Sequence, residues 1–239
     1  MCEIYTDVDG VYTCDPRVVP DARKIDVIAY DELLEMASSG SKVMQSRSVE
    51  FAKKFKVPFE VRSSFNNNRG TIVKEESIGL ENVVVRGISL ERKQAKVTIT
   101  HVPDKPGTAS RIFTALAEAN VIIDVIVQNV SVSGATDISF TMSADELEKV
   151  GSIIDRIAGE VGAGEVLKKS GIAKLSVVGI GMRSHSGVAA TLFECLGNGG
   201  VNIQMISTSE IKIAVILDES QIDNAAKLAH AAFGLAEGK

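Results

Sequence analysis

The chain has 239 residues, 45% of them hydrophobic, enough for one large domain or two to three small ones with packed cores. A formal net charge of −5 disfavours a nucleic-acid partner, because basic groups are needed to replace counterions along a phosphate backbone. No apolar run reaches the ~18 residues of a membrane span, the amino terminus lacks a signal-peptide pattern, and three scattered cysteines fit neither disulfides nor a metal site. We therefore expect a cytoplasmic protein, without membrane or metal, whose partners are small molecules or proteins.

The first third of the chain has the pattern of an α/β sheet. Apolar alternation predicts strands at residues 2–6, 57–61 and 71–73. Acids near one end and an apolar face predict helices at residues 31–37 and 48–55. This order indicates part of an α/β sheet, with the chain starting inside it.

Residues 5–17, 40–43 and 61–65 carry a long and specific match. They closely resemble the carboxy-terminal half of the catalytic domain of aspartate kinases. The resemblance implies ATP contacts from Thr6, Asp7, Tyr12, Arg17, Lys42 and Val43. The residue types suit that role, since Arg17 and Lys42 neutralise phosphate charge and Tyr12 packs against the nucleotide. From the residues alone, a surface loop with a few charges remains an alternative.

The sequence departs from that family at its start. Aspartate kinases begin with a strand and a Lys-Phe-Gly-Gly-Thr-Ser loop that cradles phosphates, followed by aspartate-binding residues, and this sequence has neither. Phosphoryl transfer depends on positioning and charge stabilisation, so half a site gives almost no rate. We therefore assign no catalytic residues and expect the chain to be inactive alone. ATP with Mg²⁺ is expected in the complete enzyme, and no cofactor is expected to bind this chain tightly.

The rest of the chain contains an internal repeat. Residues recur without a gap 80 positions later in six pairs: Gly107 and Gly187, Phe113 and Phe193, Leu116 and Leu196, Val121 and Val201, Ile123 and Ile203, Ile126 and Ile206. Such a register indicates a duplicated supersecondary unit. The first copy predicts strands at 83–88, 96–102, 121–127 and 138–142, a helix after Pro106 and a helix capped by Ser143. The second predicts strands at 173–178, 201–203 and 211–217 and helices at 186–196 and 221–233.

Each copy resembles an ACT domain, a small ferredoxin-like module that binds amino acids. We expect an α+β protein in which two βαββαβ ACT modules follow a partial α/β amino-acid-kinase segment. The expected division is a kinase remnant at 1–75, a polar linker at 76–82, a first module at 83–165 and a second at 166–239. In this family one module is often inserted in the other, so the strand at 83–89 is an alternative member of the second sheet.

The stretch Asp104-Lys105-Pro106-Gly107 is the expected centre of an effector site. A helix start offers unpaired N–H groups and partial positive charge to an α-carboxylate, and Gly107 permits close approach. Asp104 can pair with the α-ammonium, while Gln128 and Asn129 can bond a side-chain hydroxyl. The effector residues expected in the first module are Asp104, Gly107, Ala109, Ile122, Ile123, Asp124, Gln128 and Asn129. The alternative interpretation makes Asp104 a helix cap and the two amides strand caps.

The second copy lacks the acid, because Ser184 stands where the first copy has Asp104. Similarity to threonine- and lysine-inhibited relatives instead implies that Asn202, Ile203, Ser209 and Glu210 complete the effector site across a subunit interface. Glu210 suits a cationic effector such as lysine. Residues 179–182 precede a helix but lack the third glycine of a dinucleotide fingerprint, so we reject that function.

These observations favour the regulatory part of an aspartate kinase. Its modules would bind threonine and/or lysine and control ATP-dependent phosphorylation of aspartate to 4-phospho-aspartate. The expected assembly is a homodimer through the ACT modules, with a catalytic aspartate kinase subunit as a further candidate partner. Two alternatives stay open: a competent kinase of which this is a partial sequence, and a free-standing amino-acid sensor.

Overall fold

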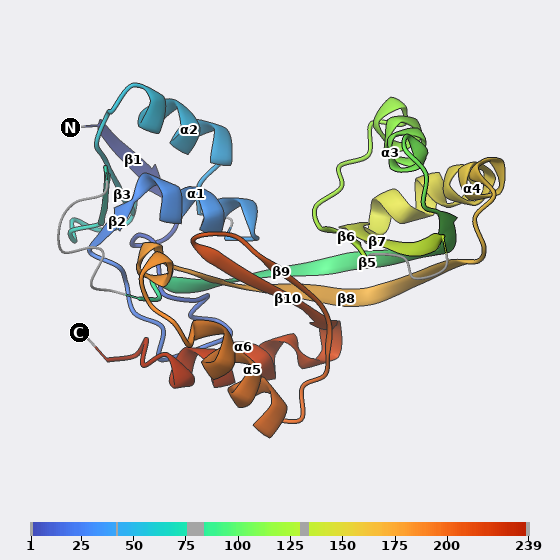
Figure 1. Cartoon of the computed structure of the whole chain (residues 1–239). Helices are drawn as coiled ribbons and strands as arrows, with labels where there is room; N and C mark the ends of the chain where they lie inside the picture. The colour runs from blue at the N-terminus through green and yellow to red at the C-terminus, as the bar shows by residue number, and fades with distance from the viewer. Residues whose placement is uncertain (1, 42, 76–83, 130–133, 238–239) are drawn as a thin grey trace. The chain divides into compact units, whose positions relative to one another are not determined.

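The computed structural model describes residues 2–41, 43–75, 84–129 and 134–237. It divides into two compact units (Figure 1). Unit 1 comprises Met1–Glu91 and Lys174–Lys239, and unit 2 comprises Arg92–Ala173. The expected linker at 76–82 lies outside the described residues. Within the described ranges, no helix is long and apolar enough to cross a membrane.

The amino-terminal part of unit 1 is a four-stranded sheet covered by two helices. The strand order is β1-β3-β4-β2, with β1 parallel to β3, β2 parallel to β4, and β3 antiparallel to β4. The strands are β1 (Cys2–Thr6), β2 (Val27–Ala29), β3 (Phe59–Ser63) and β4 (Thr71–Lys74). The helices are α1 (Tyr30–Ser38) and α2 (Ser46–Lys54). The strand at 2–6 and both helices were predicted, whereas β2 was missed because three residues carry too little periodicity.

The core of this sheet lies on the side of α1 and α2. Phe59 and Val61 of β3 pack with Leu33 and Met36 of α1 and with Val49 of α2, and all five are nearly inaccessible to solvent. Because side chains alternate across a strand, Glu60 and Arg62 face the opposite side. Burial of these apolar groups, worth about 1.5–3 kcal/mol for each large side chain, holds α1 on the sheet.

Unit 1 also contains a second module, formed by the start of β5 and by the chain from Lys174 onward. Its strand order is β5-β8-β10-β9, and β10 is antiparallel to β9. The elements are β5 (Gly87–Pro103), β8 (Val166–Val178), α5 (Val188–Asn198), β9 (Ile203–Thr208), β10 (Lys212–Asp218) and α6 (Ile222–Ala232). Unit 1 includes β5 only to Glu91 and β8 only from Lys174. The helices α5 and α6 pack side by side over the sheet (Figure 1).

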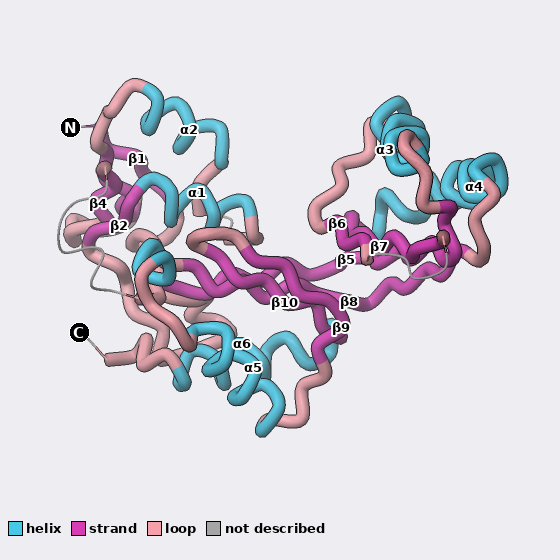
Figure 2. Tube along the Cα trace, in the orientation of Figure 1, coloured by secondary structure: helices cyan, strands magenta, loops and turns pink. Residues whose placement is uncertain are grey.

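Unit 2 has the order β5-α3-β6-β7-α4-β8, a ferredoxin-like βαββαβ module. Its strands are arranged β6-β7-β5-β8, under the paired helices α3 (Thr108–Glu118) and α4 (Ala144–Val161) (Figure 2). The other elements are β6 (Ile126–Gln128) and β7 (Ala135–Ser143). Ile112 and Leu116 of α3 pack with Ile154 of α4 and Phe140 of β7. Phe113 meets Phe140 edge to face with ring centroids 5.5 Å apart.

Helix α4 begins where the sequence predicts. Ser143 Oγ accepts a hydrogen bond from the Glu146 backbone N–H at 3.2 Å, and Glu146 Oε2 accepts from the Ser143 N–H at 3.3 Å. This reciprocal pair is a capping box. Gly162, with φ 74°, ends the helix in the left-handed conformation that favours glycine.

The strand expected at 96–102 is confirmed, but two other strand predictions were wrong. The strand expected at 83–88 is not a separate element, because β5 starts at Gly87 and continues without a break to Pro103. The apolar run at 121–127 forms a strand only from Ile126. Before it, the Val121 N–H bonds the last turn of α3 at Leu116 O (3.1 Å), and the Asp124 N–H bonds Thr141 O (3.0 Å). Irregular hydrogen bonds therefore replace a ladder over 121–125.

Candidate functional site

The two copies of the repeat start their helices with the same backbone conformation. Gly107 has φ 92° and ψ −12° at the start of α3, and Gly187 has φ 95° and ψ −11° at the start of α5. This left-handed conformation strains any residue with a Cβ. Since nothing lies within 4 Å of a Cβ built at either glycine, both positions are open on that side. Each module therefore presents an accessible helix N-terminus.

A hollow of about 530 Å³ lies at the N-terminus of α3 in unit 2. Gly107 lines it together with Lys105, Thr108 and Arg111, and Val161 of α4 forms part of its wall. Two cationic side chains and the positive end of the helix make this hollow attractive to a carboxylate. Sequence reasoning found Gly107 but missed Arg111, although its position one turn after Gly107 places it on the same face.

Asp104 is exposed in the loop before this hollow, but it is not among the residues that line the hollow, whereas its neighbours Pro103 and Lys105 are. Its backbone N–H donates to Gly134 O at 3.0 Å, which holds the loop against the start of β7. The N-cap of α3 is Gly107, so the alternative that makes Asp104 the helix cap is wrong. The Asp104 carboxylate is thus presented to solvent next to the helix start.

The remaining residues expected in the first module lie in α3, in the segment that leads into β6, and at the end of β6. Gln128, Asn129, Asp124 and Ile122 are exposed, and the Ile122 side chain is 76% exposed. In contrast, Ala109 and Ile123 pack against the core of unit 2. Thr136 Oγ1 donates to Asn129 O, which fixes the end of β6. The structure therefore separates this set into exposed groups able to meet a ligand and two residues that support them.

The residues expected in the second module lie on and beside the β9–β10 hairpin of unit 1. Ser209 and Glu210 form its exposed turn, Asn202 is exposed just before β9, and Ile203 is half-buried. Glu210 Oε2 is 3.3 Å from Arg183 Nε, and both side chains are largely exposed. An exposed pair of this kind contributes about 0–1 kcal/mol, so a cationic ligand can displace Arg183 at small cost.

The residues expected to meet ATP follow β1 in unit 1. Thr6 Oγ1 accepts from the Val8 N–H (3.2 Å) and shapes the turn, and Asp7 is exposed. Tyr12 is half-buried and pairs with Lys24 through an antiparallel bridge, and burial raises its pKa. Arg17 Nη2 is 2.8 Å from Asp15 Oδ2, yet the Arg17 side chain is 90% exposed. Its exposure leaves that guanidinium open to an anionic ligand.

The last two expected ATP residues lie in the loop after α1. Val43 is half-buried and packs against the core beneath β3, and Lys42 lies outside the described residues. The Ser41 N–H donates to Met36 O at 2.9 Å, so the start of this loop is fixed to the last turns of α1.

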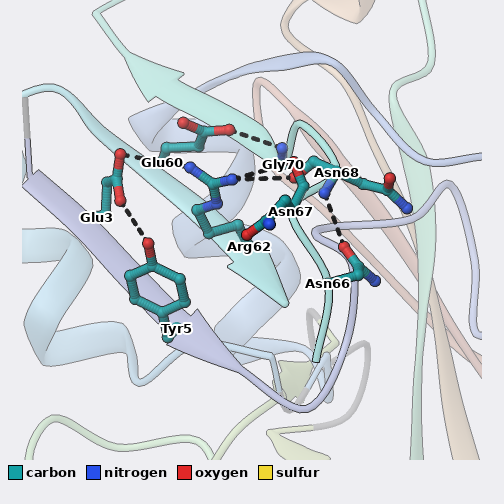
Figure 3. A network of polar contacts seen from close by, with 8 residues as sticks. All are labelled: Glu3, Tyr5, Glu60, Arg62, Asn66, Asn67, Asn68 and Gly70. Atoms are coloured by element: carbon teal, nitrogen blue, oxygen red, sulfur yellow. Dashed lines mark hydrogen bonds and ion pairs between the residues drawn. The ribbon is translucent and has the colours of Figure 1, made fainter. Parts of the chain in front are cut away.

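A polar network joins β1, β3 and the loop that follows β3 (Figure 3). Glu3 Oε2 accepts from Tyr5 Oη at 2.7 Å, and Arg62 lies 5.6 Å from the centre of the Tyr5 ring. Asn66 Nδ2 donates to Asp9 Oδ1 at 2.7 Å and joins the turns after β3 and β1. Sequence reasoning did not connect Asp9 with Asn66, because only the parallel β1–β3 register brings them together.

Three family models match separate parts of the chain. The model of the amino acid kinase family matches residues 1–63, and two models of the ACT domain match residues 96–159 and 175–233. An aspartate kinase of Pseudomonas putida is 50% identical over 235 residues, which cover 98% of this chain and 57% of that protein. The crystal structure of aspartokinase alpha and beta subunits is 43% identical with TM-score 0.59, and covers 63% of this chain and 99% of that one.

The chain belongs to the aspartate kinase family. The match to the alpha and beta subunits decides this, because it is specific in sequence and spans nearly all of that chain. Full-length relatives agree: Clostridium acetobutylicum aspartate kinase is 25% identical with TM-score 0.87, covering 97% of this chain and 54% of that one. E. coli aspartokinase III, crystallised with lysine and aspartate in the T-state, is 27% identical with TM-score 0.75, and the match covers 97% of this chain and 51% of that one. The chain thus spans little more than half the length of the full-length relatives it matches.

Proposed function

We propose that this chain is the regulatory, feedback-sensing part of an aspartate kinase, whose ACT modules bind threonine and/or lysine. The observation that carries the proposal is the helix start at Gly107 with its adjoining hollow. In this proposal Lys105, Arg111 and the helix N–H groups bind the α-carboxylate. Asp104, which is exposed in the adjoining loop, binds the α-ammonium. An amino acid carries both charges on one carbon, so it matches this pair of opposite charges.

The identity of the effector depends on the groups around its side chain. Gln128 and Asn129 offer neutral donors and acceptors to the hydroxyl of threonine, and Glu210 offers a carboxylate to the ammonium of lysine. E. coli aspartokinase III has been crystallised with lysine, which supports lysine as one effector here. We propose that the exposed turn at Ser209 and Glu210, with Asn202 and Ile203, completes the site of a second subunit in a homodimer.

In the complete enzyme, the regulated reaction is ATP-dependent phosphorylation of aspartate to 4-phospho-aspartate. The exposed Arg17 guanidinium and the half-buried Tyr12 ring fit a nucleotide, since one meets phosphate charge and the other an aromatic base. Among the described residues no three His, Cys, Asp or Glu side chains gather into a metal-binding group. We expect Mg²⁺ to enter the site bound to the phosphates of ATP. A catalytic aspartate kinase subunit is a further proposed partner.

Replacement of Asp104 tests the proposed site. Asp104→Ala should weaken effector binding at least tenfold in calorimetry, because it removes the partner of the ammonium. The matched control is Asp145→Ala, which deletes another exposed carboxylate of unit 2 and should leave the affinity within twofold. Equal affinities for the wild type and Asp104→Ala would place the site elsewhere. Phosphorylation of aspartate by the purified chain would instead support the alternative of a competent kinase.

A further inference from the structure

The hairpin turn that carries Ser209 and Glu210 contacts helix α1 of the kinase segment within unit 1. Ile211, next to Glu210, packs with Ile180 and with Ala29, the residue before α1, and all three are buried. One residue further, Lys212 Nζ is 2.7 Å from Glu35 Oε2 of α1. The two residues that follow the turn, Ile211 and Lys212, therefore touch the kinase segment directly.

A second connection passes through the segment after β8. The Gly179 N–H donates to Ile211 O at 3.0 Å, and the next N–H, that of Ile180, donates to Glu32 Oε1 at 3.1 Å. Glu32 belongs to the first turn of α1 and is fully buried. Its other oxygen, Oε2, accepts from Arg86 Nε at 3.2 Å and from the Ala29 N–H at 3.3 Å. One carboxylate thus joins the start of α1 to the backbone that holds the turn.

These bonds make independent movement of the turn and α1 costly. A buried donor that loses its acceptor is unfavourable, and a buried carboxylate separated from its cation is more so. A displacement at Ile211 therefore either breaks the bonds of Glu32 or carries α1 with it. The last turns of α1 in turn hold Ser41, ahead of Val43, one of the residues expected to meet ATP.

We propose that Glu32 is a positioning residue that couples the 209–212 turn to α1 and so to the loop that follows α1. An effector or partner subunit that shifts the turn would shift α1 in the same step. This inference deepens and rests on the proposed function, because it assigns the connection between the effector turn and the kinase segment. Coupling of this kind is limited to the free-energy difference that the ligand creates between the two positions.

Hydrogen exchange of the full chain tests the coupling without any ligand. Ile211→Ala removes the contact with Ala29 and Ile180, whereas Ile206→Ala truncates a side chain of β9 that is 43% exposed and serves as the matched control. Amides of residues 30–38 should exchange at least tenfold faster in Ile211→Ala, with residues 59–63 of the same unit changed less than threefold. Unchanged exchange at 30–38, or equal acceleration in both segments, would overturn the proposal.

A second arm uses lysine and threonine at saturation. Binding to the wild type should change exchange at 30–38 at least threefold. In Glu32→Gln the effector Kd should stay within threefold of the wild-type value, but the exchange response at 30–38 should be lost. The control Glu50→Gln, on the exposed side of α2, should respond as the wild type does. Should Glu32→Gln not fold, Glu35→Gln tests the Lys212 connection and should halve the response. An effector that binds without any response at 30–38 contradicts the coupling. An absence of binding contradicts the proposed function, while the first arm still decides the coupling.

Discussion

Replacing Glu32 with alanine should destabilise unit 1 far more than an ordinary helix substitution. Three donors converge on this buried carboxylate: the Ala29 and Ile180 N–H groups and the Arg86 guanidinium. Removing one partner of a buried ion pair costs about 3–5 kcal/mol. Each backbone N–H without an acceptor adds about 1–3 kcal/mol, part of which water entering the space recovers. We therefore expect a loss of roughly 5 kcal/mol in the free energy of unfolding.

Thermal and urea unfolding, followed by circular dichroism, measure this loss. At about 2–4 °C per kcal/mol for a unit of this size, Tm should fall by roughly 10–20 °C. Glu32→Gln keeps one acceptor oxygen and should lose about 2 kcal/mol. Glu50→Ala removes an exposed carboxylate of α2 and should stay within about 0.5 kcal/mol of the wild type. A cost below about 1 kcal/mol for Glu32→Ala would refute the reasoning from burial.

Three further predictions concern a thiol, an imidazole and a helix cap. Burial raises the pKa of Cys14 to about 12, so roughly one thiol in 3,000 is ionised at pH 8.5. Iodoacetamide should label exposed Cys2 rapidly and Cys14 only after denaturation, and equal labelling of the folded chain would contradict this. Burial also lowers the pKa of His230, against a smaller opposing effect of Asp21. As the pH is lowered through ~6.5, this histidine is protonated in the unfolded state before it is protonated in the folded state. The free energy of unfolding should therefore decrease as the pH is lowered, by up to about 1.4 kcal/mol for each pH unit. His230→Gln should remove this dependence and exposed His185→Gln should keep it; an unchanged slope in His230→Gln would be the adverse result. Ser143→Ala removes the N-cap of α4 and should cost about 1 kcal/mol, read as faster hydrogen exchange at the start of α4. Ser143→Thr retains the hydroxyl and should exchange like the wild type, and unchanged exchange in Ser143→Ala would show that the cap contributes nothing.

Local signals in the sequence predicted much of the fold. Ser143 marked the start of α4, and the repeat of Gly107 at Gly187 predicted equivalent helix starts. These features depend on residues within one turn of each other, so the neighbouring residues in the sequence are sufficient to predict them. The family resemblance likewise rested on uninterrupted stretches of the sequence, the longest at residues 5–17.

Local signals of this kind could not predict the long-range contacts. Glu32 is an acid in the first turn of a helix, a position that normally indicates only a favourable interaction with the helix dipole. Its bond to the Ile180 N–H joins residues 148 positions apart. The irregular segment at 121–125 was missed for a related reason: its apolar residues match a strand, but their backbone bonds go to Leu116 and Thr141. Arg111 was overlooked as a site residue because the hollow it lines also needs Val161 of α4.

Titration calorimetry of the purified wild-type chain tests the central claim most directly. Light scattering should first establish the oligomeric state, after which L-threonine and L-lysine are titrated separately and together. We predict saturable binding of at least one of them with a Kd of about 1 mM or tighter, and no binding of its D-enantiomer. No saturable heat from either amino acid, alone or combined, at about 10 mM in dimeric protein would contradict it.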